Sequence, residues 1–120
     1  GRKKDVIVLK NGKNVFPDEI EQLLNHLPCI KETMVYGITA EDGDVELGAK
    51  LVYDKDEFVE QVGIMTDEEM NDWYMSKIKE VNKKMPTYKY IRKLIVTDEP
   101  LIKTTTNKVK RHEEIKKIMG

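Results

Sequence analysis

The chain has 120 residues and a formal net charge of -1, with 39% hydrophobic and 36% charged residues. This is the length of one domain, its apolar content is too high for a disordered chain, and no apolar run approaches the roughly 18 residues that a membrane span requires. The single cysteine, Cys29, excludes an internal disulfide and a cysteine-based metal site and suits a reducing compartment, while His26 and His112 lie far apart in the sequence, which argues against a histidine metal site.

The charge is distributed unevenly along the chain. Residues 1–15 and residues 101–120 each carry a net charge of +4, whereas the residues between them carry -9. Two basic ends could bind one polyanion such as a nucleotide, or each could be an ordinary solvated surface. From charge alone we prefer the solvated surface.

The N-terminal region predicts a β-hairpin followed by a helix. Asn11-Gly12 lies between two short apolar segments, and an Asn-Gly pair is typical of a tight hairpin turn because both residues tolerate a positive φ. Pro17 and the two acidic residues after it suit the first turn of a helix. Leucine and isoleucine at helical spacing continue the pattern until Pro28 ends it, so we predict a helix over 17–27.

Two strands are predicted next. Residues 34–38 and 47–53 are apolar and are separated by an acidic, glycine-containing turn at 41–44, which favours an antiparallel pair. Residues 54–65 are polar and predict an irregular connection.

The C-terminal half predicts a long helix, a strand and a short basic helix. Thr66 and Glu69 form a capping box ahead of an apolar stripe that continues to Met85. Residues 91–97 predict the third strand, and residues 108–119 a basic helix after a Thr-rich loop. The expected fold is one α+β domain over residues 1–120, with a small mixed sheet of about three strands, an N-terminal β-hairpin and three flanking helices.

General catalytic motifs are missing from the sequence. It contains no phosphate-binding P-loop, no GxGxxG, no GxSxG and no HExxH. Asp42 and Asp44 are interpreted as a solvated turn, and Cys29 as a buried structural thiol. Trp73 and its neighbours are interpreted as helix-packing residues.

Two segments nevertheless carry an unusual pattern. Residues 1–21 read GRKKDVIVLKNGKNVFPDEIE, and residues 103–111 read KTTTNKVKR. The second segment presents lysine beside a helix start, where backbone N–H groups and an ammonium could bind an anion together, although an ordinary capped basic helix has the same composition.

Taken together, these segments resemble two signatures of the adenylate-forming superfamily, which includes acyl- and aryl-CoA synthetases, peptide-synthetase adenylation domains and luciferases. The first resembles GRxKDxI…GxxVxPxEIE and the second KTxTGKIxR, with Asn107 in place of the usual glycine. The Pro-Thr-Tyr-Lys sequence at 86–89 also matches, so the resemblance covers essentially the whole chain. The versions found here look most like bacterial long-chain fatty-acid CoA ligases.

The resemblance implies a mobile C-terminal domain whose large N-terminal domain is absent from this chain, and the lack of an initiator Met agrees with that expectation. In the family, a carboxylate attacks the α-phosphate of ATP to give an acyl-adenylate, the C-terminal domain rotates, and the thiol of coenzyme A then displaces AMP. The fragment alone is expected to be inactive. Fatty-acid metabolism is the implied setting.

The resemblance also implies roles for individual residues. Lys108 matches the lysine that enters the active site for adenylation and contacts the nucleotide, Lys4 matches the hinge, and Arg2 matches a nucleotide-contacting arginine at the domain junction. Gly12, with Lys13 beside it, matches the hairpin that lines the pantetheine tunnel during thioester formation.

Lys89 and Arg92 are further candidates for contacting the nucleotide of coenzyme A. Each can equally be a surface base, which is the interpretation we prefer.

The implied partners are the protein's own N-terminal domain, a fatty acid, ATP and coenzyme A, with ATP and Mg²⁺ held mainly by that N-terminal domain and no metal held by this one. A carrier-protein pantetheine is an open alternative acceptor. We expect a cytoplasmic protein, and peripheral association of the full-length enzyme with the inner face of the membrane stays open.

Two other classes of function stay open. One is a free-standing module whose basic ends bind nucleic acid or another polyanion, although no nucleic-acid motif supports it. The other is a regulatory or carrier-interacting domain descended from the ligase fold.

Overall fold

The computed structural model describes residues 6–10, 12–39, 41–103, 105–106 and 109–119. Short strands and helices alternate along these residues, which confirms the predicted α+β class. In chain order the elements are β1 (Ile7–Val8), β2 (Asn14–Val15), α1 (Pro17–Leu24), β3 (Ile30–Thr39), β4 (Val45–Tyr53), α2 (Lys55–Gln61), α3 (Asp67–Asn82), the 3₁₀-helix η1 (Thr87–Lys89), β5 (Ile91–Thr97) and α4 (Arg111–Met119).

A mixed three-stranded sheet forms the centre of the molecule, with β4 between β3 and β5. The β3–β4 pair is antiparallel, as predicted, and β5 runs parallel to β4. The parallel pairing is possible because α2 and α3 carry the chain back to the end of the sheet at which β4 begins. Lys50, near the middle of β4, lies opposite Met34 on β3 and Ile95 on β5.

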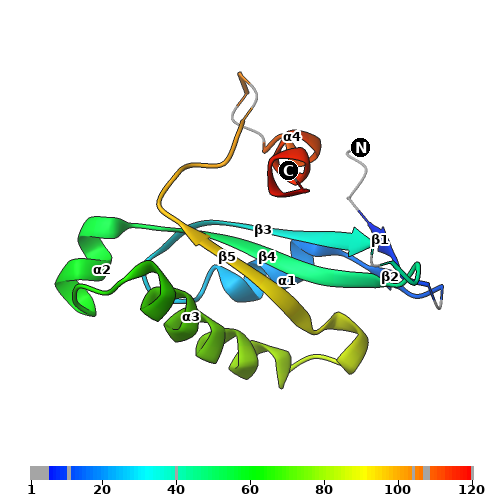
Figure 1. Ribbon diagram of the computed structural model, residues 1–120, viewed down its shortest axis with the longest axis horizontal. Coiled ribbons are helices and arrows are strands. Elements are labelled where there is room, and N and C mark those ends of the chain that lie inside the picture. The colour runs from blue at the N-terminus through cyan, green and yellow to red at the C-terminus, as the bar shows by residue number, and fades with distance from the viewer. Residues whose placement is uncertain (1–5, 11, 40, 104, 107–108, 120) are drawn as a thin grey trace.

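The two faces of this sheet are covered differently. Helices α1 and α3 lie against one face and α4 lies over the other (Figure 1). Alternate strand residues therefore enter two separate cores. The larger core contains Val35, Ala49 and Leu51 with the apolar stripes of α1 and α3, and the smaller contains Met34, Tyr36, Val52 and Leu101, with Ile115 and Ile118 of α4 packed against it.

The N-terminal hairpin forms where Asn11-Gly12 predicts it. Gly12 has a φ of 84°, and the turn is closed by hydrogen bonds of 2.9 Å from Leu9 N to Lys13 O and from Gly12 N to Leu9 O. Leu9 and Val15 are buried in the core shared with α1 and α3. The hairpin is therefore attached to the α1/α3 side of the sheet.

Several local predictions are confirmed. The side chain of Thr66 accepts a hydrogen bond from Glu69 N while the Glu69 carboxylate accepts one from Thr66 N, so the capping box begins α3. The third strand covers residues 91–97 as predicted.

Several predicted segments differ from the structure: the strand predicted at 34–38 covers Ile30–Thr39, and α3 ends at Asn82 rather than 85. Residues 55–61 of the connection predicted to be irregular form α2, because Asp54 accepts a hydrogen bond from Glu57 N and Phe58 is fully buried, whereas residues 63–65 are irregular as predicted. Helix α1 ends at Leu24 rather than 27, with turn hydrogen bonds continuing to Leu27. Helix α4 begins at Arg111 rather than 108, because Val109 pairs with Lys103 in an antiparallel bridge.

Among the described residues, no helix is long and apolar enough to cross a membrane.

Candidate functional site

Gly12 and Lys13 lie at the tip of the β1–β2 hairpin, where the backbone is exposed. A Cβ atom at Gly12 would meet no atom within 4 Å, so the glycine is required here by its φ rather than by crowding. Lys13 places its Nζ 4.4 Å from the centroid of the Tyr88 ring, which lies on η1. This cation–π contact brings the hairpin and η1, which are about 75 residues apart in sequence, side by side.

Two more of the predicted candidates lie around the same tyrosine. Lys89 Nζ is 5.8 Å from the Tyr88 ring centroid and 3.9 Å from a carboxylate oxygen of Glu19 on α1. Arg92, on β5, lines the neighbouring pocket with Tyr88. The structure therefore places Lys13 and Lys89 at the Tyr88 ring and Arg92 in the pocket beside it.

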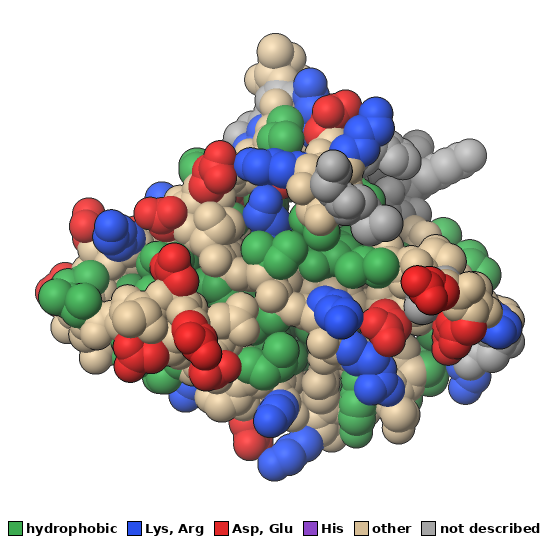
Figure 2. Space-filling view, in the orientation of Figure 1, with side chains coloured by type: hydrophobic (Ala, Val, Ile, Leu, Met, Phe, Trp, Pro, Cys, Tyr) green, Lys and Arg blue, Asp and Glu red, His purple; other side chains and the backbone are tan. Residues whose placement is uncertain are grey.

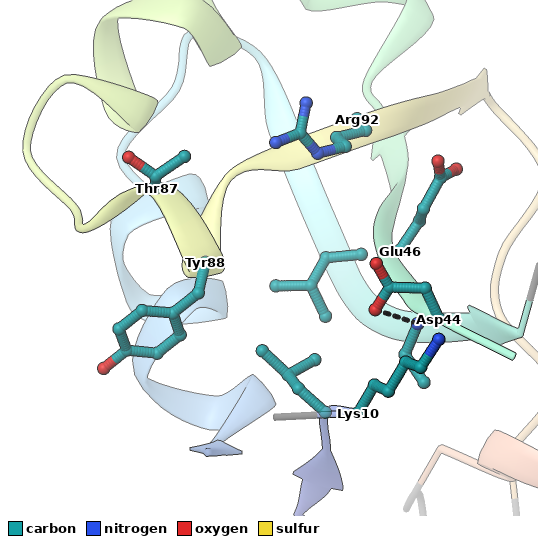
Figure 3. A pocket seen from close by; sticks show the side chains of 9 residues that line it. Lys10, Asp44, Glu46, Thr87, Tyr88 and Arg92 are labelled. Carbon is teal, nitrogen blue, oxygen red and sulfur yellow. Dashed lines mark hydrogen bonds between the residues drawn. The ribbon is translucent and has the colours of Figure 1, made fainter. Parts of the chain in front are cut away.

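The pocket beside Tyr88 is an open hollow of about 490 Å³ between the hairpin, β4 and η1 (Figure 3). Its charged groups are mixed, since Arg92 and Lys10 stand on opposite sides and Asp44 and Glu46 lie between them. The Asp44 carboxylate accepts a hydrogen bond of 2.9 Å from the backbone N–H of Val45, the first residue of β4. Polar walls of both signs suit a ligand that carries both phosphate and amine groups.

The described residues of the second predicted segment, 103–111, and the two residues before it lie on the other side of the sheet. Leu101 is buried in the smaller core, and Val109 packs partly buried against it. Lys103 and Val109 pair as an antiparallel bridge, and Lys110 N donates a 2.7 Å hydrogen bond to Ile102 O. Residues 101–103 and 109–110 therefore form a paired base for the Thr-rich loop, called the loop base below. Thr105 and Thr106, in the loop itself, are exposed.

Two carboxylates bind residues 101–103, the first half of the loop base. Glu32 Oε2, from β3, accepts a 3.1 Å hydrogen bond from Leu101 N, and Glu32 Oε1 forms an ion pair with Lys103. Glu114 Oε2, from α4, accepts a 2.8 Å hydrogen bond from Ile102 N. Sequence reasoning named neither glutamate, because each acts on residues that are distant along the chain or lie in another element.

The three remaining candidates, Arg2, Lys4 and Lys108, lie outside the described residues. Tyr88 and Lys10 were also not named by sequence reasoning. The signal that could have found Tyr88 is an aromatic residue two positions after Pro86 and next to Lys89, but such a signal is weak without the hairpin beside it.

The structure confirms the interpretation of Cys29 as a buried thiol. Cys29 is buried, and burial together with the nearby carboxylates of Glu57 and Asp54 raises the pKa of its thiol, which makes it a poor nucleophile. No group of three or more His, Cys, Asp or Glu side chains among the described residues could hold a metal ion. On the face seen in Figure 2, basic and acidic side chains are interspersed.

Comparison with known proteins gives consistent matches over this fold. A family model described as AMP-binding enzyme C-terminal domain matches residues 4–118. The mitochondrial medium-chain acyl-CoA ligase ACSF2 of Danio rerio is 34% identical over 113 residues, which are 94% of this chain and 16% of that protein.

Solved structures match with the same coverage. The apo structure of MatB from Rhodopseudomonas palustris is 25% identical with a TM-score of 0.70, over 100% of this chain and 22% of that one. A double mutant of o-succinylbenzoate CoA synthetase from Bacillus subtilis, bound to its product analogue, is 25% identical with a TM-score of 0.62, over 94% of this chain and 20% of that one. The chain thus spans about a fifth of the length of the proteins it matches.

Proposed function

Since the chain belongs to the family of AMP-binding enzyme C-terminal domains, we propose that it serves as the mobile C-terminal domain of an AMP-forming ligase that joins a fatty acid to coenzyme A. Its own N-terminal domain is then its first partner, and ATP, a fatty acid and coenzyme A are the substrates. The reaction has two steps. The carboxylate attacks the α-phosphate of ATP and releases pyrophosphate, and the thiol of coenzyme A then attacks the acyl carbon and releases AMP.

The observation that supports this proposal best is the placement of the two motif segments on opposite sides of one sheet. The Gly12 hairpin is anchored in the core shared with α1 and α3, and Leu101 and Val109, on either side of the Thr-rich loop, are anchored in the core under α4. Presenting each segment to the same active site requires a reorientation of the whole domain between the two steps. This geometry supports the proposed alternation of the domain between two orientations.

Lys108 serves the first step in this proposal. Carboxylate and triphosphate are both anions, so a cation held between them lowers the electrostatic cost of their approach and stabilises the charge that moves during the transfer. A lysine ammonium is a compact charge on a flexible stem and can follow the phosphate as the bonds change. Arg2 would add a second cation near the nucleotide.

The hairpin and the pocket beside it serve the second step. Gly12 has no side chain, so the narrow pantetheine chain can pass close to the hairpin backbone at this position. Lys13 is the next residue of the hairpin. The basic groups around Tyr88, namely Lys13, Lys89 and Arg92, are placed to meet the phosphates of the coenzyme A nucleotide, and the Tyr88 ring could stack on its base. This gives Lys89 and Arg92 a role beyond that of surface bases.

Mg²⁺ belongs to the N-terminal domain in this proposal. The described residues of this domain offer no cluster of acidic or histidine ligands that fits the ion. The preference for a long acyl chain rests on the form of the two motifs alone, because the residues that measure chain length would also lie in the N-terminal domain.

The proposal is tested in the full-length protein with Lys108→Ala. Acyl-adenylate formation, followed as pyrophosphate release, should fall by at least about 100-fold, because the loss of one preorganised charge from a transition state costs on that order. Thioester formation from supplied acyl-adenylate and coenzyme A should stay within about threefold of wild type. Lys116→Ala, an exposed lysine of α4 with the same change of charge, is the matched control and should leave both steps unchanged. Equal loss of both steps in Lys108→Ala would contradict the role given to Lys108.

A further inference from the structure

Lys50 and Glu114 form a buried ion pair that no step of the proposed reaction uses. Lys50 Nζ lies 2.9 Å from Glu114 Oε1, and the two side chains are 6% and 0% exposed. Lys50 sits in the central strand between Met34 and Ile95, so its ammonium is surrounded by apolar side chains on the α4 face of the sheet. A pair of this kind recovers little or none of the free energy lost when both charges leave water.

The second carboxylate oxygen of Glu114 links the ion pair to the loop base. Glu114 Oε2 accepts the 2.8 Å hydrogen bond from Ile102 N, the residue that precedes Lys103 in the loop base. Burial alone would raise the pKa of Glu114, but the hydrogen bonds from Lys50 and Ile102 and the positive charges of Lys50 and Lys117 outweigh it and lower that pKa. Glu114 is therefore an ionised carboxylate. One of its oxygens binds Lys50 of the sheet, and the other accepts the hydrogen bond from Ile102 N in the loop base.

Two further sets of contacts fix the loop base: backbone hydrogen bonds of Lys110, and contacts made by Glu32. Glu114 N donates a 3.0 Å hydrogen bond to Lys110 O, and Lys110 N donates one of 2.7 Å to Ile102 O. Glu32 binds Leu101 N and Lys103 from β3. Carboxylates from two different elements thus bind two consecutive backbone N–H groups, at the entry of the segment that includes Lys108.

We propose that Glu114, held by Lys50, is a positioning residue for adenylation, which fixes residues 101–103 and 109–110, the described residues that flank Lys108 in the sequence. This proposal rests on the proposed function of Lys108. The carboxylate fixes where the segment leaves the sheet, and a displacement of about 1 Å at a reacting group can cost on the order of 100-fold in rate. An apolar pair would fill the same space but could not bind Ile102 N.

The deciding experiment replaces the pair with apolar side chains of similar size, Lys50→Met together with Glu114→Leu, in the full-length protein. Because apolar replacement of a buried ion pair is often neutral for folding, Tm should stay within about 5 °C of wild type. The kcat of adenylation should fall by about 10- to 100-fold while KM for ATP and for the acid changes less than about threefold. Thioester formation from supplied acyl-adenylate should be unaffected.

Hydrogen exchange provides a readout that does not depend on catalysis. Peptides that cover Leu101 and Ile102 should exchange faster in the double variant, and peptides from α3 should not change. The matched control is Lys83→Met with Glu80→Gln, an exposed pair on α3 at 3.2 Å, which should alter neither exchange at 101–102 nor either step. Glu114→Gln, which keeps the shape but not the charge, is a second variant if the double variant does not fold, and it should show the same selective loss to a smaller extent.

Several results would overturn the proposal. Wild-type adenylation in the folded double variant would do so, as would unchanged exchange at 101–102 or an equal loss in both steps. A wild-type protein that forms no acyl-adenylate would instead refute the proposed function, and the exchange result would still show whether Glu114 fixes the loop base.

Discussion

Gly12 and Gly43 are two residues with the same backbone geometry and different expected roles. Both have a φ of 84°, and at neither position would a Cβ meet an atom within 4 Å. Alanine at either site should therefore cost about 1 kcal/mol of folding free energy, from the strain of a left-handed residue alone. Urea unfolding of the two variants should give equal losses.

The two glycines should differ in catalysis. Gly12→Ala in the full-length protein should slow thioester formation by about tenfold or more, because a methyl group would narrow the path of the pantetheine chain, and should spare adenylation. Gly43→Ala should leave both steps unchanged. If the two variants show the same thioester kinetics, Gly12 has no place in the tunnel and serves only the hairpin turn.

Residues that belong to a local pattern or a motif were found from the sequence, whereas Glu32 and Glu114, which act across the fold outside any motif, were not. Asn11-Gly12 predicted its own turn because both residues tolerate a positive φ. Glu114 gave no such signal, because it lies beside the apolar stripe of α4 and its partner Lys50 is 64 residues away. A charged residue on a basic helix looks solvated until the sheet behind it is known.

The capping box of α3 is the local feature whose energetic role is simplest to measure. Thr66→Ala removes the acceptor for Glu69 N and should lower the free energy of unfolding by about 1 kcal/mol. Thr66→Ser keeps the hydroxyl and is the matched control, with a loss of less than about half that size. Denaturant unfolding measures both, and an equal loss in the two variants would mean that the hydroxyl does not stabilise α3.

Helices and strands with strong end signals were predicted well, and short or tertiary-dependent ones were not. The hairpin, the capping box of α3 and the strand at 91–97 all form where the sequence places them. Helix α2 was missed because its seven residues carry a single N-cap and one fully buried side chain, Phe58, too little for a periodic pattern. Val109, which was predicted to lie in the first turn of α4, instead pairs with Lys103 in an antiparallel bridge.

At the scale of the whole molecule, the sheet separates the two segments to which the proposed function assigns the two steps. Lys13, Tyr88 and Arg92 belong to the surface beside the hairpin, and the loop base held by Glu32 and Glu114 belongs to the surface under α4. Sequence motifs identified both segments but could not place them on opposite faces, since that depends on the alternation of residues in β3 and β4. The hinge and the catalytic lysine, Lys4 and Lys108, stay predictions because they lie outside the described residues.

The hinge role of Lys4 has a direct test. Proline fixes φ near -65°, so Lys4→Pro should hold the domain in one orientation. One step should then fall by about tenfold or more while the other stays near wild type. Lys4→Ala removes the side chain, keeps backbone rotation and is the control, which should change the ratio of the two rates far less. Unchanged kinetics of both steps in Lys4→Pro would exclude position 4 as the hinge.

The central claim, that one domain serves the two steps with two opposite surfaces, is tested most directly by one crossed measurement. The rates of adenylation and of thioester formation are measured separately in full-length Lys108→Ala and Gly12→Ala, and the ratio of the two rates is compared with that of wild type. The ratio of adenylation to thioester formation should fall by at least about 30-fold in Lys108→Ala and rise by about tenfold in Gly12→Ala. A ratio that moves in the same direction in both variants, or in neither, would contradict the account.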